Sequence, residues 1–242
     1  MARYAMVTDL RKCVGCHACT VACNGEWNVP AGHARTHVHT TPLEGTFPNL
    51  AASPYVAQCN HCDDAPCLAA CPSGATFRSP DGIVRIDRKV CIGCGYCVEA
   101  CPYDARYIDE AVKKADKCDF CAARLERGEQ PACVATCTAH AKYFGDLEDR
   151  RGEVFHLVYS NDAQRVESAR VAVGPNVYYL GKRERMELVK AAFAPREPRL
   201  PASGGAWRVV RPLIMVAVGA TFLGQAAAFF NQLWNGEQDD DE

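Results

Sequence analysis

Residues 13–23 read CVGCHACTVAC and residues 91–101 read CIGCGYCVEAC, so the spacing C-x2-C-x2-C-x3-C occurs twice in this chain. Two more groups have looser spacing, C-x2-C-x4-C-x3-C and C-x2-C-x11-C-x3-C. The four groups use all 16 cysteines of the 242 residues: Cys13, Cys16, Cys19 and Cys23; Cys59, Cys62, Cys67 and Cys71; Cys91, Cys94, Cys97 and Cys101; Cys118, Cys121, Cys133 and Cys137.

This spacing is typical of iron–sulfur cubes. A [4Fe-4S] cube takes one thiolate at each iron, and three cysteines at two-residue intervals can wrap around three of its corners. In two-cluster bacterial ferredoxins, which share the run, the fourth cysteine binds the neighbouring cube. We therefore predict four [4Fe-4S] clusters, with Gly15 and Gly93 allowing the backbone to approach the sulfurs. We also expect each fourth cysteine to lie in a turn that opens a helix.

Two other uses of the cysteines are alternatives to clusters. Disulfide bonds would use an even number of cysteines, but pairs at C-x2-C spacing would be strained. Structural zinc accepts C-x2-C pairs, yet it gives no reason for three close cysteines and a remote fourth. His17 and His61 lie inside cysteine groups, but each cube already has four thiolates, so neither is expected to be a ligand. The cluster interpretation is preferred over zinc and disulfides.

The motifs in their order resemble one protein family. CNHCDDAPCLAACP (59–72), CIGCGYCVEACP (91–102) and KCDFC…PACVATC (117–137) are similar to the four-cluster electron-transfer (beta) subunits of molybdenum or tungsten bis-pterin oxidoreductases. That family includes the iron–sulfur subunits of DMSO, polysulfide and thiosulfate reductases and of respiratory formate dehydrogenase. The resemblance runs from Ala5 to Gly181 and ends on PNVYYLG (175–181). Some nitrate reductase subunits have Trp where this chain has Cys94, so the resemblance implies four complete [4Fe-4S] clusters.

The resemblance also implies that each cube takes its ligands from two groups. The implied sets are Cys13, Cys16, Cys19 and Cys137; Cys23, Cys118, Cys121 and Cys133; Cys59, Cys62, Cys67 and Cys101; Cys71, Cys91, Cys94 and Cys97. The expected fold class is α+β, with two interleaved bacterial two-cluster ferredoxin-like units and one C-terminal transmembrane helix. The outer unit comprises residues 1–57 and 105–193, and the inner unit, residues 58–104, is inserted into it.

The transmembrane helix is predicted from residues 213–230, LIMVAVGATFLGQAAAFF, which carry no charge. At 1.5 Å per residue they span about 27 Å, close to the ~30 Å hydrocarbon core of a bilayer. We expect a linker over 194–206, the helix over 207–234 and an acidic tail over 235–242. Ala220, Gly224 and Ala228 recur every four residues, a spacing that lets a second membrane helix pack closely. A buried core helix is the alternative.

The resemblance implies a non-catalytic subunit of an oxidoreductase complex in anaerobic respiration. Its partners would be a pterin-containing catalytic subunit and an integral membrane quinone-reactive or cytochrome b subunit. The W-x2-V-R-P-L and A-T-F-x-G stretches near the C-terminus are similar to the anchor of formate dehydrogenase beta subunits, whereas the soluble end is more similar to the polysulfide reductase group. The alternative is the iron–sulfur wire of a hydrogenase or quinol dehydrogenase complex without a pterin subunit.

Charge and motifs exclude other functions. The formal net charge is -2 and the basic residues form no stripe, so nucleic acid is not an expected partner. No nucleotide-binding or nucleophile motif indicates substrate chemistry in this chain. Basic residues near the cysteine groups are expected to offset the thiolate charge: Lys12, Arg88, Lys89, Lys113, Lys114, Lys117 and Arg124.

Two arguments about the membrane face disagree. Arginines precede the predicted span and acidic residues follow it, so the positive-inside rule would put the cluster domain in the cytoplasm. Formate dehydrogenase-like anchors instead place that domain outside. A folded domain that already holds its clusters is not threaded through the membrane. We therefore expect an inner-membrane, single-pass protein with its soluble domain on the periplasmic face, and the cytoplasmic face is the alternative.

Three local predictions concern secondary structure. The alternating stretch GIVRI (82–86) predicts a strand. EAVKKAD (110–116) predicts a short helix or a turn. Residues 160–171 predict a helix capped by Asn161 or Asp162.

Overall fold

The structure is a computed structural model that describes residues 2–167, 171–199, 216, 220–221 and 224–227. The chain divides into two compact units, Met1–Leu200 and Pro201–Glu242. All the strands and helices with defined bounds lie in the first unit. The unit combines short helices with small sheets whose strand pairs are antiparallel except for β1 with β11, so its helix and strand content is mixed.

A three-stranded sheet joins the beginning of the chain to its later part. The central strand β1 (Tyr4–Asp9) runs antiparallel to β10 (Lys142–Asp146) and parallel to β11 (Val177–Leu180). Met6 and Val7 of β1 are completely buried and belong to two different apolar clusters, one on each face of the sheet. Helix α6 (Glu153–Tyr159) packs against β1 and β10. The N-terminal strand is therefore held between segments that are remote in the sequence.

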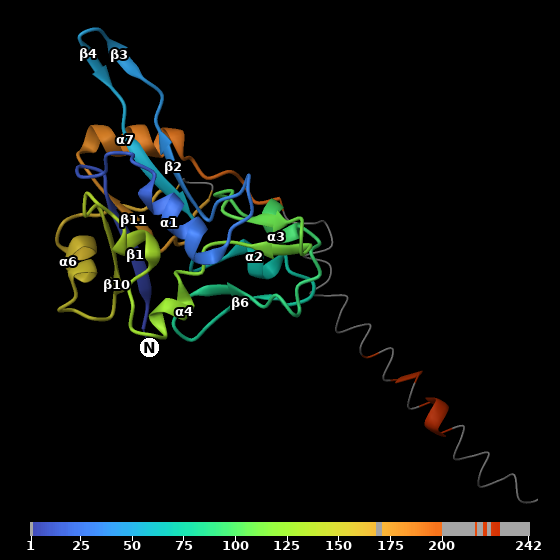
Figure 1. The fold of residues 1–242 in the computed structure, drawn as a ribbon. Coiled ribbons are helices and arrows are strands. Elements are labelled where there is room, and N and C mark those ends of the chain that lie inside the picture. Colours follow the sequence, from blue (N-terminus) through green and yellow to red (C-terminus); the bar gives the residue numbers. More distant parts are fainter. Residues whose placement is uncertain (1, 168–170, 200–215, 217–219, 222–223, 228–242) are drawn as a thin grey trace, which may run out of the picture. The chain divides into compact units, whose positions relative to one another are not determined.

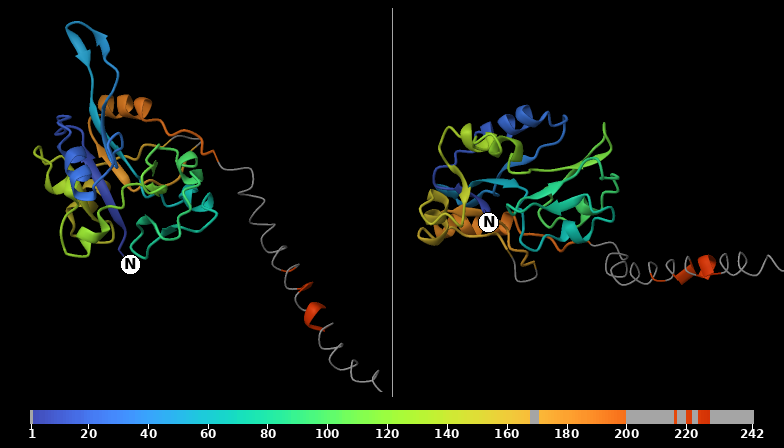
Figure 2. Two further views of the ribbon diagram at one scale, coloured as in Figure 1. Left: turned by 45° about the vertical axis from the view of Figure 1, so that its right-hand side comes forward. Right: turned by 90° about the horizontal axis from the view of Figure 1, so that it is seen from below.

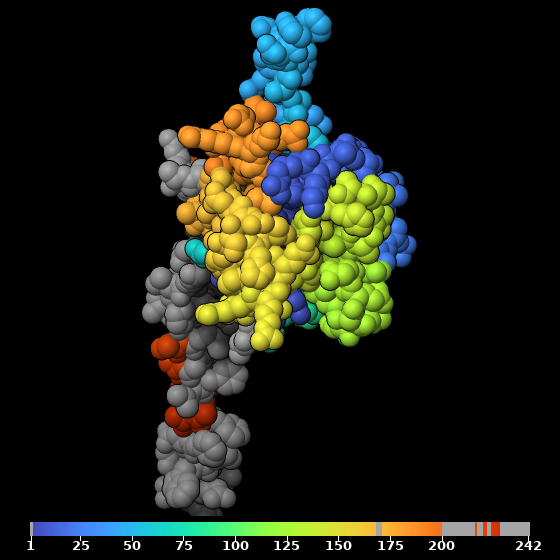
Figure 3. All heavy atoms as spheres, turned by 90° about the vertical axis from the view of Figure 1, so that its left-hand side faces the viewer, coloured from blue at the N-terminus to red at the C-terminus, as the bar shows by residue number. Residues whose placement is uncertain are grey.

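The other strands form four two-stranded antiparallel sheets. They are β2 (Thr36–Thr40) with β5 (Pro54–Gln58), β3 (Glu44–Thr46) with β4 (Asn49–Ala51), β6 (Thr76–Arg78) with β7 (Val84–Ile86), and β8 (Tyr107–Asp109) with β9 (Lys114–Asp116). Of the strand predicted over 82–86, residues 84–86 form β7. The β3–β4 hairpin projects from the body of the unit (Figures 1 and 3).

Most of the helices near the cysteines are only four residues long. They are α2 (Pro66–Ala69), α3 (Tyr96–Glu99), α4 (Ala122–Leu125) and α5 (Ala132–Ala135), whereas α1 (Ala18–Trp27) has 10 residues. Helices α2, α3 and α5 each contain the third cysteine of a group, and the fourth cysteine follows the helix. The expectation that each fourth cysteine opens a helix is therefore wrong. The x3 interval spans about one helical turn, and that turn lies before the fourth cysteine.

Two further local predictions need comment. Residues 110–113 form a turn and residues 114–116 belong to β9, so the turn rather than the helix is found there. The helix predicted over 160–171 is wrong for its described residues. Helix α6 ends at Tyr159, and Gln164 forms a β-bridge with Tyr179. Asp162 has φ 57°, a left-handed conformation that ends a helix rather than capping its start.

The elements near the cysteines gather in two regions of the first unit. Figures 1 and 2 show β6, α2 and α3 on one side and β1, β10 and α6 on the other. Helix α1 packs against α5, and α2 packs against α3. Segments from both ends of the cysteine-rich region therefore meet in one place, and the segments between them meet in another.

The C-terminal predictions lie largely outside the described residues. Residues 194–199 follow helix α7 (Arg183–Ala192) without further helix or strand. Within the predicted span 207–234, the described residues 216, 220–221 and 224–227 are helical. In the described part of the chain, no helix is both long enough and apolar enough to cross a membrane. The acidic tail 235–242 lies outside the described residues.

Candidate functional site

Four cysteines from the two ends of the cysteine-rich region line one hollow, which we call site I. They are Cys13, Cys16, Cys19 and Cys137, and Val38, Val56 and Lys142 lie beside them. Cys16 is exposed, whereas Cys19 is buried. These four cysteines are those of the first set that the resemblance implies.

A second hollow, site IV, is lined by Cys71, Cys91, Cys94 and Cys97. It matches another implied set and again draws on two cysteine groups. Helix α3 carries Cys97, and the turn after α2 carries Cys71. Cys94 is exposed. Sites I and IV are alike, since each combines three closely spaced cysteines with one remote cysteine and exposes the middle member of the three.

Site II is the buried set of Cys23, Cys118, Cys121 and Cys133. Burial raises the pKa of the Cys23 thiol to about 12, and the neighbouring sulfurs of Cys133 and Cys121 contribute to the rise. Burial likewise raises the pKa of Cys118, next to the sulfurs of Cys23 and Cys133. Helix α5 carries Cys133, and its packing on α1 brings it to Cys23.

Site III is the buried set of Cys59, Cys62, Cys67 and Cys101. Burial raises the pKa of Cys62, and the sulfurs of Cys59, Cys101 and Cys67 add to the effect. Burial also raises the pKa of Cys67 to about 11, against the opposing charge of Arg106. Thiols in such surroundings ionise only when a cation compensates them, as bound iron does. The donor set of sites II and III thus fits an iron–sulfur cluster.

In all four sites, at least one cysteine sulfur accepts a hydrogen bond. Backbone N–H groups donate to Cys137 at 3.2 Å, to Cys71 and Cys101 at 3.4 Å and to Cys91 at 3.5 Å. The indole Nε1–H of Trp27 donates to the sulfur of Cys121 at 3.3 Å. Donors of this kind stabilise negative charge on sulfur and raise the reduction potential of a cluster.

A glycine is required in the loop of site IV. Gly93 has φ +71°, and a Cβ atom there would lie 2.2 Å from the carbonyl oxygen of Lys113. Gly15 is at the equivalent place in site I, with φ +69° and a Cβ position 3.1 Å from Pro54. Both loops therefore need glycine for its left-handed conformation, and Gly93 also allows the β8–β9 turn to approach closely.

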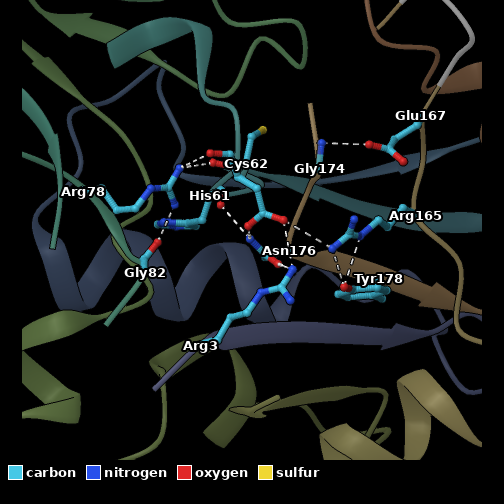
Figure 4. Close-up of polar contacts among 11 residues, drawn as sticks. Arg3, His61, Cys62, Arg78, Gly82, Arg165, Glu167, Gly174, Asn176 and Tyr178 are labelled. Atoms are coloured by element: carbon cyan, nitrogen blue, oxygen red, sulfur yellow. Dashed lines mark hydrogen bonds and ion pairs between the residues drawn. The ribbon is translucent and has the colours of Figure 1, made fainter. Parts of the chain in front are cut away.

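A network of polar contacts holds the loop that carries Cys62 (Figure 4). Arg78 donates to the carbonyl oxygens of Cys62 and Asp63. Asn176 donates to the carbonyl oxygen of His61 at 2.9 Å and to the carboxylate of Asp63 at 2.8 Å. The loop of site III is therefore fixed from β6 on one side and from the start of β11 on the other.

An aromatic pair lies between sites II and III. His61 precedes Cys62 and Phe120 precedes Cys121, and their rings stack with centroids 3.7 Å apart. Both side chains are almost completely buried. The backbone N–H of Val84 donates to His61 Nδ1 at 3.1 Å, which orients the ring. His61 is thus part of the packing between two sites.

In the described residues no three His, Cys, Asp or Glu side chains converge on a point that one metal ion could fill.

Buried cations near the sulfurs differ from those expected. Of the basic residues named from the sequence, Lys117 is buried and donates to the carbonyl oxygens of Val84 and Cys118, whereas Lys12 and Arg88 are exposed. Sequence reasoning missed Arg106 and Lys142, which are both 5 % exposed and lie beside cysteine sulfurs. A signal was present, since Cys101 and Cys137 are each followed by x3-Ala and then by one of these two residues.

Comparisons with known proteins identify similar iron–sulfur proteins. Models of the 4Fe-4S dicluster domain match residues 12–76 and 52–147. The B subunit of tetrathionate reductase from Salmonella typhimurium is 44% identical over 181 residues, which are 74% of this chain and 72% of that protein. The thiosulfate reductase electron transfer subunit PhsB of Salmonella typhi is 42% identical over 69% of this chain and 88% of its own length. Protein NrfC of Escherichia coli K12 is 40% identical over 73% and 79%, respectively.

Proposed function

This chain belongs to the family of 4Fe-4S dicluster electron-transfer subunits, and we propose that its four [4Fe-4S] clusters relay electrons between two partner proteins bound at opposite ends of the relay. Two dicluster domains hold four clusters, and the 16 cysteines supply their ligands without a remainder. A [4Fe-4S] cluster supplies one-electron chemistry, and the chain's task is to hold the clusters, shield them and set their potentials.

We assign the ligands of the four clusters to sites I to IV as defined above. The two cysteine-lined hollows support sites I and IV, and the mutual proximity of buried sulfurs supports sites II and III. The same arrangement supports the division into an outer unit, residues 1–57 and 105–193, and an inner unit, residues 58–104. Pairing of β1 with β10 closes the outer unit, and packing of α2 on α3 closes the inner one.

The sites follow one another in the order I, II, III, IV. Cys19 of site I interacts electrostatically with Cys133 of site II, and Cys118 of site II does so with Cys59 of site III. Arg106 interacts with sulfurs of both sites III and IV. This continuous series, buried in its middle and exposed only at Cys16 and Cys94, is the observation that carries the proposal.

Exposed apolar side chains lie close in sequence to the cysteines at both exposed ends. Val14 and Val21 are 69% and 70% exposed beside site I, and Ile92 and Tyr96 are 65% and 43% exposed beside site IV. Large apolar side chains grouped at the surface are typical of interaction sites. Each end of the relay can therefore dock a partner close to a cluster, as fast electron transfer needs.

We assign site IV to the membrane side. Arg196 and Arg199 donate backbone N–H groups to the carbonyl oxygens of Pro102 and Glu99, at 3.0 and 3.2 Å, so the chain leaves the first unit beside helix α3. From Arg199 to the predicted span at 207, an extended chain reaches less than about 30 Å. The exit of the chain beside α3 supports a membrane partner at site IV and a catalytic partner at site I.

For the membrane partner we propose an integral quinone-reactive or cytochrome b subunit that packs on Ala220, Gly224 and Ala228 of the span. For the catalytic partner we propose a pterin-containing reductase of sulfur compounds, because two relatives are subunits of tetrathionate and thiosulfate reductases. The protein would be a single-pass inner-membrane protein with the cluster domain on the periplasmic face. Protease treatment of intact spheroplasts tests the last point, since a cluster domain that is protected until lysis would mean the cytoplasmic face.

The relay is tested by interrupting it in the middle. Cys118→Ala would remove a ligand of the buried site II. In the purified complex, turnover between the substrate and a quinone should be lost, while the catalytic subunit should still react with a soluble redox dye. Quinone-linked turnover at the wild-type rate would refute the proposal. Co-purification with a hydrogenase or quinol dehydrogenase in place of a pterin subunit would favour the alternative complex.

A further inference from the structure

Two buried cations, Arg106 and Lys142, have a common arrangement that the relay itself does not require. Each side chain is 5 % exposed, and for neither do the described residues provide an ion pair with a carboxylate. Another buried cation nearby, Lys117, donates to two backbone carbonyl groups instead. A buried cation without a carboxylate must be balanced by other negative charge. Within the described part of the chain, cysteine sulfurs are the negative groups beside Arg106 and Lys142.

Arg106 lies between sites III and IV. Its Nη2 donates to the sulfur of Cys67 in site III at 2.9 Å, and its Nη1 donates to Thr76 Oγ1 at 3.2 Å. It interacts electrostatically with three sulfurs of site III, those of Cys67, Cys59 and Cys101, and with Cys97 of site IV. One guanidinium group is thus shared by two neighbouring sites.

Lys142 occupies the matching place between sites I and II. It lines the hollow of site I, and its Nζ donates to Gln58 Oε1 at 2.7 Å. Its charge interacts with three sulfurs of site II, those of Cys133, Cys118 and Cys23, and with Cys19 of site I. Strand β10, which carries Lys142, packs on helix α5, which carries Cys133 of site II, so the ammonium group is shared by two sites, as the guanidinium of Arg106 is.

The two positions are equivalent in an internal repeat. CPYDARY (101–107) and CTAHAKY (137–143) share the pattern C-x3-A-(R/K)-Y, and CPSGATF (71–77) places Thr76 at the same point. In the first two, the alanine N–H donates to the sulfur of the preceding cysteine, at 3.4 Å for Cys101 and 3.2 Å for Cys137. The same local loop thus delivers one cation to each half of the relay.

We propose that Arg106 sets the reduction potentials of sites III and IV as a pair, and that Lys142 does the same for sites I and II. The inference rests on the ligand assignment made under the proposed function. Each electron that enters a site adds a negative charge, and a fixed cation in a poorly screened interior stabilises that reduced state. Removing the cation therefore shifts the potential to more negative values. Because each cation faces two sites, two potentials shift together and two do not.

The test is a potentiometric titration of the anaerobically purified complex, in which mediators exchange one electron with each site and electron paramagnetic resonance reports the reduced clusters. The neutral variants are Arg106→Met and Lys142→Met, and the charge-retaining variants are Arg106→Lys and Lys142→Arg. Lys12→Met is the control, because Lys12 is exposed although it adjoins Cys13. Wild-type protein with about sixteen iron atoms and four signals establishes the clusters independently of the inference.

Arg106→Met should shift two of the four midpoint potentials to more negative values, and Lys142→Met should shift the other two. The charge-retaining variants should stay closer to wild type, and Lys12→Met should leave all four unchanged. Equal shifts of all four potentials, no shift, or the same pair in both variants would overturn the proposal. If a neutral variant loses iron, the proposal requires that the charge-retaining variant at the same position keeps its iron. Loss of iron from both would assign the residue to packing and would also overturn the proposal.

Discussion

The buried ion pair between Arg35 and Asp116 allows a stability prediction with a control on the same carboxylate. Arg35 precedes β2 and donates to both oxygens of Asp116 in β9, at 2.9 and 2.8 Å. Both side chains are 8% exposed. The pair joins two segments of the proposed outer unit beside site II, and the guanidinium also lies over the ring of Trp27.

Arg35→Met would leave the carboxylate of Asp116 buried without its main partner. Removing one member of a buried pair costs about 3–5 kcal/mol. Tyr107 Oη would still donate to Asp116 at 2.6 Å and Arg88 would remain nearby, so we expect about 3 kcal/mol, the lower end of that range. For a chain of this size, such a loss lowers Tm by roughly 6 to 12 °C.

The assay is anaerobic thermal unfolding of the cluster-loaded protein at one scan rate, because loss of the clusters makes unfolding irreversible. Arg88→Met is the matched control, since Arg88 contacts the same carboxylate at 3.2 Å but its side chain is 48% exposed. An exposed pair contributes about 0–1 kcal/mol, so the control should lose less than roughly 4 °C. Equal shifts in the two variants, or a shift below about 2 °C for Arg35→Met, would refute the reasoning.

Three further predictions concern the sites. Gly93→Ala places a Cβ 2.2 Å from the carbonyl oxygen of Lys113, so site IV should lose its iron. The control Gly25→Ala has no atom within 4 Å of the added Cβ and should keep all of the iron. Iron analysis of both variants tests this. Phe120→Ala removes the ring stacked on His61 and should destabilise the loaded protein by about 3–5 kcal/mol in anaerobic unfolding, and an unchanged Tm would contradict this. Stripping iron with a chelator should abolish most far-ultraviolet circular dichroism of the short helices, because metal binding supplies folding free energy; native-like spectra of the iron-free chain would show otherwise.

The cluster chemistry could be predicted from the sequence more accurately than the local secondary structure could. Cysteine spacing identified the clusters, because a cube imposes its own geometry on the ligands whatever the rest of the chain does. Helix boundaries were less predictable. The short helices α2, α3 and α5 end two residues before the fourth cysteine of their group, and Asp162 has a left-handed backbone where its side chain was suited to cap a helix. Such left-handed residues outside glycine leave little trace in sequence.

Contacts between the sites could not be predicted from any single motif. His61 and Phe120 occupy equivalent positions in two C-x2-C pairs, but their stacking depends on how the pairs face each other. The buried cations were missed for another reason. Attention to residues close before the cysteine groups selected Lys12 and Arg88, which are exposed. Arg106 lies five positions beyond Cys101 and becomes a neighbour of Cys67 only after folding. An internal repeat search over the residues that follow each fourth cysteine would have found it.

The crossed ligand sets are the central claim, and they are tested most directly by pairing serine variants according to the spectroscopic signal that each one damages. The four variants are Cys13→Ser, Cys137→Ser, Cys23→Ser and Cys133→Ser, examined by electron paramagnetic resonance of the reduced protein. We predict that Cys137→Ser damages the same signal as Cys13→Ser, although the two residues are 124 positions apart in the sequence, and that Cys133→Ser and Cys23→Ser damage a different signal together. If Cys137→Ser and Cys133→Ser, only four residues apart, damaged one and the same signal, the crossed arrangement would be contradicted.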